Sequence, residues 1–193
     1  MDALSGPIWA AFALLAVAGA PKVLDPFDTL RAVRAAAPKL SVSHRWVRAF
    51  GAVEAVIGVL GLLTGRRVLL ALAALSYLGF TAFVVVALRR STPLSSCGCF
   101  GKADTPPTWL HVALTGLLAL LCGTVTVTAV PVSGWATAAG LVPALATATG
   151  PALLTGVFAA TICVLLYLAL AVLPTVAARP AVLGTLASPG GTP

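Results

Sequence analysis

Five long apolar runs, separated by short polar segments, constrain the fold of this chain more than any other feature. They lie at about residues 7–24, 47–64, 68–88, 109–130 and 151–173. A helix needs roughly 20 apolar residues to cross the hydrocarbon core of a bilayer, where unpaired backbone groups are costly. The alternation typical of a membrane β-barrel is not seen. The pattern predicts an all-α integral membrane bundle of four to five transmembrane helices.

Composition supports this fold class. Of the 193 residues, 60% are hydrophobic and 9% are charged, which leaves too little polar surface for a water-soluble globule. The net charge of +7 comes from basic residues that flank the apolar runs, so lipid headgroups explain it better than nucleic acid does. We therefore expect a multi-pass plasma-membrane protein with the bilayer as partner. Residues 1–173 are predicted to form one bundle domain, with a re-entrant or interfacial loop at 131–150 and a flexible tail at 174–193.

Successive membrane helices alternate in direction, so the loop after the first span and the loop after the third span share one membrane side. This side, the thiol face, is expected to gather Lys22, His44, Trp46, Cys97, Cys99, Trp109 and His111. Its orientation is left open by two opposing signals. Lys and Arg are more numerous here than on the other side, which favours the cytoplasm, whereas oxidative thiol chemistry usually belongs outside. The first loop is amphipathic around residues 27–40 and is predicted to form a surface helix.

Glu54 is the acidic residue of the second span, seven residues from its thiol-face end. At 1.5 Å per residue it lies about 10 Å deep, where a carboxylate should face the bundle interior. Lys22, near the same end of the first span, is its expected partner. The pair either serves a functional site or only fixes two helices together.

The pentapeptide Cys97-Gly98-Cys99-Phe100-Gly101 places two thiols one residue apart between two spans. A disulfide within Cys-x-Cys is strained and therefore easily reduced, and the two glycines permit the required backbone bending. Phe100 offers an apolar anchor at the bilayer edge. Nearby basic residues and the start of the next helix favour the reactive thiolate.

Metal binding is the alternative chemistry for these two sulfurs. His111 or His44 could complete such a site, although the spacing is not the Cys-x-x-Cys of zinc sites. Cys122 and Cys163 lie within spans at different depths, so they are predicted to be packing residues that form no disulfide with each other. Residues 77–83 are rich in aromatic side chains that either pack in the core, face lipid or line a cleft for a quinone electron acceptor.

The glycines of the second and third spans indicate close helix packing. They are Gly51, Gly58, Gly61 and Gly79.

The chain resembles the methylamine-utilisation MauE family, within the wider DoxX-like group of redox-associated membrane proteins. Three features carry the resemblance over residues 7–172: Ala20-Pro21-Lys22-Val23-Leu24-Asp25-Pro26, then Glu54, then the Cys97–Gly101 pentapeptide. The resemblance implies a helical bundle that helps mature disulfide-containing exported proteins with a thioredoxin-like partner. It also implies that the thiol face lies outside the cytoplasm.

Two functions from different classes follow. In the first, the protein is a thiol–disulfide oxidoreductase in which Cys97 and Cys99 cycle between dithiol and disulfide. Gly98, Phe100, Gly101, Glu54, Lys22 and His111 support that site. In the second, the protein is a non-catalytic assembly or transport component, and the Cys-x-Cys loop is a structural clip.

Overall fold

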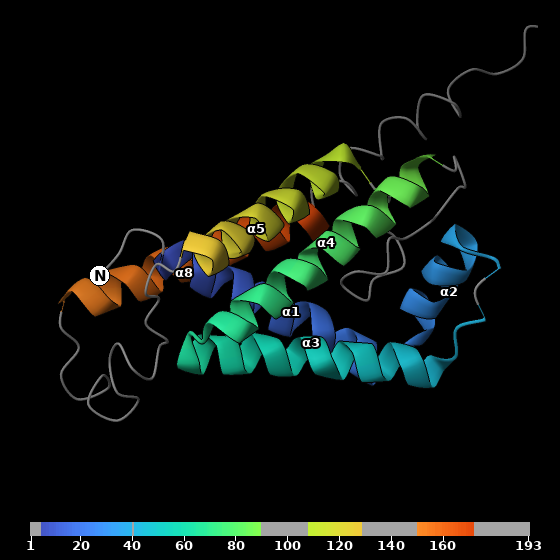
Figure 1. Cartoon of the computed structure of the whole chain (residues 1–193), viewed down its shortest axis with the longest axis horizontal. Helices are drawn as coiled ribbons and strands as arrows, with labels where there is room; N and C mark the ends of the chain where they lie inside the picture. Colours follow the sequence, from blue (N-terminus) through green and yellow to red (C-terminus); the bar gives the residue numbers. More distant parts are fainter. Residues whose placement is uncertain (1–4, 40, 90–107, 129–149, 172–193) are drawn as a thin grey trace, which may run out of the picture.

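The computed structural model describes residues 5–39, 41–89, 108–128 and 150–171. Every regular element in these ranges is an α-helix (Figure 1). The six helices are α1 (Ser5–Leu24), α2 (Phe27–Ala36), α3 (His44–Thr64), α4 (Arg67–Arg89), α5 (Trp109–Thr128) and α8 (Gly150–Ala171).

Within the described residues, α1, α3, α4 and α5 are long and apolar enough to cross a membrane. They coincide with the first four predicted runs, and α8 lies at the fifth. The protein is therefore a multi-pass helical membrane protein, as predicted. Of the predicted loop at 131–150, residues 131–149 lie outside the described residues, as does the predicted tail at 174–193, and Gly150 begins α8.

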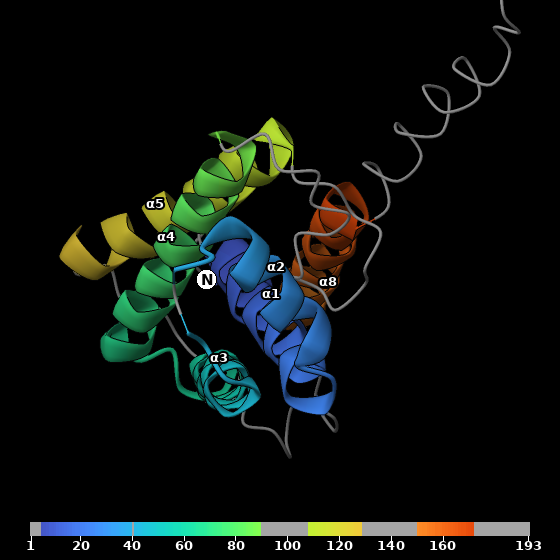
Figure 2. The ribbon, with the colours of Figure 1, turned by 90° about the vertical axis from the view of Figure 1, so that its right-hand side faces the viewer.

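Helix α1 is the centre of the bundle, and α3, α4 and α8 lie around it (Figure 2). Side chains from one of its faces are fully buried and begin the apolar core, among them Ile8, Phe12 and Leu15. Apolar surface drives no association in lipid, so tight van der Waals packing has to hold these helices together.

Glycines on α3 allow α1 and α3 to approach closely. A Cβ atom on Gly58 would lie 2.5 Å from the Ala16 backbone nitrogen, and one on Gly51 would lie 2.6 Å from Lys22 Cβ. Neither position can hold a side chain at this helix separation. Gly61 likewise faces the ring of Phe12. The packing role predicted for these three glycines is confirmed. For Gly79 it is wrong, because a Cβ there would meet no atom within 4 Å.

Side-chain hydrogen bonds join α4 to α1 and to α5. The Tyr77 hydroxyl donates to the carbonyl oxygen of Ala11 over 2.6 Å, and Thr81 Oγ1 lies 2.8 Å from Thr115 Oγ1 on α5. Buried polar groups are stable in a bilayer only when they are paired in this way. The turn between α3 and α4 is short because Gly65 adopts the left-handed conformation, with a φ of 60°.

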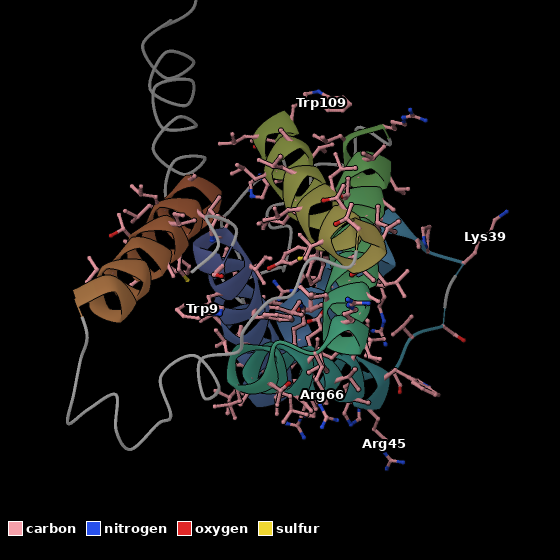
Figure 3. The ribbon with its side chains drawn as sticks, turned by 60° about the vertical axis from the view of Figure 1, so that its left-hand side comes forward. Trp9, Lys39, Arg45, Arg66 and Trp109 are labelled. Carbon is pink, nitrogen blue, oxygen red and sulfur yellow. The ribbon has the colours of Figure 1, made fainter. Side chains whose placement is uncertain are left out.

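Helix α2 is the surface helix that the amphipathic segment predicted. Leu30, Ala32 and Ala36 are buried, whereas Arg31 and Arg34 are exposed to the outside. Figure 1 shows α2 at the same end of the bundle as the C-terminal ends of α1 and α4 and the N-terminal ends of α3 and α5. At this end Lys39, Arg45 and Trp109 point away from the helices (Figure 3). The helix ends that bound the thiol face therefore do lie together.

Candidate functional site

A buried ion pair joins α1 to α3 near the thiol face. Lys22 Nζ donates to Glu54 Oε2 over 2.6 Å, and the two side chains are only 3% and 1% exposed. Lys22 occupies the last turn of α1, and Gly51, one turn before Glu54, leaves room for its side chain. The interior position of Glu54 and its pairing with Lys22 are confirmed.

The Lys22 ammonium group also faces aromatic rings. Its nitrogen lies 4.4 Å from the centroid of the Phe80 ring on α4 and 6.0 Å from that of Phe50 on α3. Both distances are within the range of cation–π attraction, which is strongest where the cation is desolvated. Lys22 thus interacts with both neighbouring helices at once.

One carboxylate oxygen of Glu54 is not used by the ion pair. Among the described residues, Oε1 of Glu54 has no hydrogen-bond partner, although it is buried. Ionisable groups within membrane spans are costly, and they commonly mark functional sites. The free oxygen can accept a proton or a hydrogen bond that the ion pair itself does not use.

A pocket of about 390 Å³ opens beside the ion pair. It lies between the end of α1 and helices α2, α3 and α4, and Lys22 is the charged residue of its lining. Four aromatic side chains also line it: Trp46, Phe50, Phe80 and Phe83. Gly79 belongs to the same wall, which explains why its missing side chain leaves open space instead of a helix contact.

Sequence reasoning did not find this pocket as such. It grouped residues 77–83 as one aromatic stretch, whereas the structure separates them. Tyr77 is buried in the core, and Phe80 and Phe83 line the pocket. The signal that could have identified it was Gly79, which directly precedes Phe80 within the aromatic stretch.

His111 is buried in the first turn of α5, and its Nδ1 lies 2.8 Å from Thr108 Oγ1. The backbone N–H of Thr108 also donates to Nδ1, so this nitrogen acts as an acceptor. His44 is exposed at the start of α3. In the part of the chain that the structure describes, no cluster of three or more His, Cys, Asp or Glu residues could hold a metal ion.

The predicted catalytic pair, Cys97 and Cys99, lies outside the described residues together with Gly98, Phe100 and Gly101. Their placement on the thiol face stays a prediction. The other two cysteines are both free thiols, as predicted. Cys122 is completely buried in the core, and Cys163 on α8 packs against this core.

These features define a class: a multi-pass helical membrane protein with a buried Lys–Glu pair and an apolar, aromatic pocket beside it. The family model described as "Methylamine utilisation protein MauE" matches residues 3–130, a range that contains helices α1 to α5 and the pentapeptide. The chain belongs to the MauE family, and the resemblance seen in its sequence is confirmed. Neither the curated proteins nor the solved structures contain a significant match to it.

Proposed function

We propose that the protein is a membrane thiol–disulfide redox protein that assists disulfide formation or maturation of exported proteins. Cys97 and Cys99 carry the exchange, and a thioredoxin-like protein is the soluble partner. The disulfide of the pair takes up two electrons and two protons from two thiols of the partner, so the pair becomes a dithiol and the partner thiols become a disulfide. The partner in turn oxidises the exported client protein.

The observation that carries this proposal is the Cys-x-Cys pair in a loop joining α4 to α5 in a MauE-family chain. The ends of those two helices lie at the same end of the bundle as Lys22. Thiolates attack disulfides and thiols do not, so a cationic surrounding near the loop favours the exchange. Arg89 and Lys102 flank the loop in sequence and supply that charge.

The ion pair and His111 have supporting roles in the proposal. Thiol–disulfide exchange moves protons as well as electrons, and Glu54 has a buried oxygen that can accept one. Lys22 holds the carboxylate in place. His111 starts the helix that follows the loop, and its hydrogen bonds with Thr108 fix the point at which the chain leaves the loop.

The test uses serine variants of each cysteine in membranes that contain the full chain. With only one thiol left in the pair, Cys97→Ser and Cys99→Ser cannot form the Cys97–Cys99 disulfide, so each should stop the oxidation of reduced thioredoxin, used as the probe. Cys163→Ser is the matched control and should behave as the wild type, because Cys163 lies within α8 and packs against the core. Unchanged oxidation of the probe in both Cys97→Ser and Cys99→Ser would exclude the proposal.

A non-catalytic assembly or transport role is the second candidate. It is favoured by the ion pair, which ties α1 to α3 and fixes their register in the way buried pairs can. Thiol trapping distinguishes the two functions. A Cys97–Cys99 pair that changes redox state when the probe is added supports the redox function, and a pair that stays in one state supports the assembly role.

A further inference from the structure

We propose that the pocket between α2, α3 and α4 binds the ring of a lipid-soluble quinone, with Lys22 Nζ donating a hydrogen bond to one of its carbonyl oxygens. The volume of about 390 Å³ falls within the range of small-molecule sites, roughly 300–1,000 Å³. Such sites combine apolar walls with a few polar groups that fix orientation, which describes this lining.

The polar end of the pocket suits an uncharged acceptor. An ammonium group has three N–H donors. Within the described residues, one N–H group of Lys22 donates to Glu54 Oε2 and a second is directed at the Phe80 ring. The third N–H group is therefore available to a ligand. The charge of Lys22 is already balanced by Glu54 at 2.6 Å. An anionic headgroup or fatty-acid carboxylate would therefore meet no net positive charge, whereas a carbonyl oxygen needs only the donor.

The walls suit a planar ring. Trp46, Phe50, Phe80 and Phe83 surround the space from two helices. Aromatic faces stack on flat conjugated molecules and gain more from them than from a flexible acyl chain. Gly79 leaves the wall of α4 open at this level, because no atom lies within 4 Å of where its Cβ would be.

The location allows access from the membrane. Trp46 and Phe50 on α3 are exposed while they line the pocket, and Thr29 of the surface helix α2 borders it. A ligand dissolved in lipid can therefore reach Lys22 without crossing water. Exposed Trp46 and Trp109 are typical of residues at the membrane–water interface.

For its redox consequence the inference rests on the proposed function. A quinone takes up two electrons and two protons and becomes a quinol, which matches the two electrons and two protons that a dithiol releases on forming a disulfide. Bound quinone would thus reoxidise the cysteine pair after each exchange.

Binding is tested separately from redox activity by using the full chain with Cys97→Ser and Cys99→Ser in nanodiscs of phosphatidylcholine. A photoreactive azido-ubiquinone is cross-linked and displaced with a short-tailed ubiquinone, and labelled peptides are mapped by mass spectrometry. The label should fall on the pocket walls of α3 and α4. Gly79→Leu, which fills the open space, should weaken binding about tenfold or more.

Gly123→Leu on α5 is the matched control, because a Cβ there also meets no atom within 4 Å and the residue does not line the pocket. It should bind as the parent chain does. Should Gly79→Leu fail to fold, Phe83→Leu removes one aromatic face with less change in volume and should also weaken binding.

Equal binding by the folded pocket variants and the control would overturn the inference. So would displacement of the label by oleate or phosphatidylglycerol at lower concentrations than ubiquinone, since the occupant would then be a lipid. Because Cys97 and Cys99 are absent from this assay, a failure of the redox proposal leaves the binding result unchanged. Conversely, thiol exchange that persists without quinone binding would remove only this inference.

Discussion

Breaking the buried Lys22–Glu54 pair should lower the stability of the folded bundle. Lys22→Met keeps most of the aliphatic stem and removes the ammonium group, which leaves the Glu54 carboxylate 1% exposed and without its partner. Removing one member of a buried pair typically costs about 3–5 kcal/mol in the free energy of unfolding. Loss of the ammonium group also removes the cation–π contact with Phe80 at 4.4 Å.

Replacing both members should restore most of the loss. In Lys22→Met/Glu54→Leu no charge remains buried, and replacement of a buried pair by apolar residues of similar volume is often close to neutral. The double variant should therefore be much more stable than the summed losses of the two single variants predict, so the double-mutant cycle should give a large coupling free energy between the two positions.

The buried thiol of Cys122 allows unfolding to be measured. Its thiol is 0% exposed in the folded bundle, so a thiol-reactive fluorophore labels it only on unfolding. With the other three cysteines replaced by serine, heating in detergent then reports the unfolding midpoint. For a chain of this length 1 kcal/mol shifts the midpoint by about 2–4 °C, so Lys22→Met should lower it by about 6–20 °C.

Two results would refute this reasoning. If Lys22→Met unfolds within about 2 °C of the parent chain, the pair contributes less than 1 kcal/mol and does not hold α1 to α3. If the double variant is as unstable as the summed losses of the single variants predict, the two charges are not coupled, and the 2.6 Å contact does not stabilise the folded bundle.

Two further predictions concern the helix contacts, and the same labelling assay measures both. Gly58→Ala would place a methyl group 2.5 Å from the Ala16 nitrogen, so α3 must move away from α1 at a cost of about 1–3 kcal/mol. Gly123→Ala, in open space on α5, should leave the midpoint unchanged or raise it, and equal effects of the two would contradict the close α1–α3 contact. Tyr77→Phe removes the 2.6 Å hydrogen bond to Ala11 and should cost about 1 kcal/mol, whereas an unchanged midpoint would show that this bond adds nothing.

The positions of the helices could be predicted from the sequence because they depend on local composition. A run long and apolar enough to cross the bilayer has to become a helix, whatever its neighbours do. The amphipathic pattern that became α2 is local in the same way. The family motifs are also local, so the three features between Ala20 and Gly101 that carry the resemblance could be seen before any contact was known.

Part of the candidate site was predictable for a related reason. A lone carboxylate inside a span requires a partner, and alternating helix direction brings only a few basic residues to its depth. Glu54 and Lys22 could therefore be paired without coordinates. The chemistry of Cys97 and Cys99 is still a prediction from the sequence, since these residues lie outside the described ranges.

Only the tertiary structure shows that a pocket exists and which glycines lie at contacts between helices. Gly58 and Gly79 look alike in sequence, yet one touches the backbone of α1 and the other faces open space. Tyr77 and Phe80 are one turn apart, yet one is in the core and the other lines the pocket. Hydrophobicity fixes that a segment becomes a membrane helix, but it is nearly uniform around such a helix. Rotation and crossing angle are therefore set by side-chain packing between helices, which only the assembled bundle specifies.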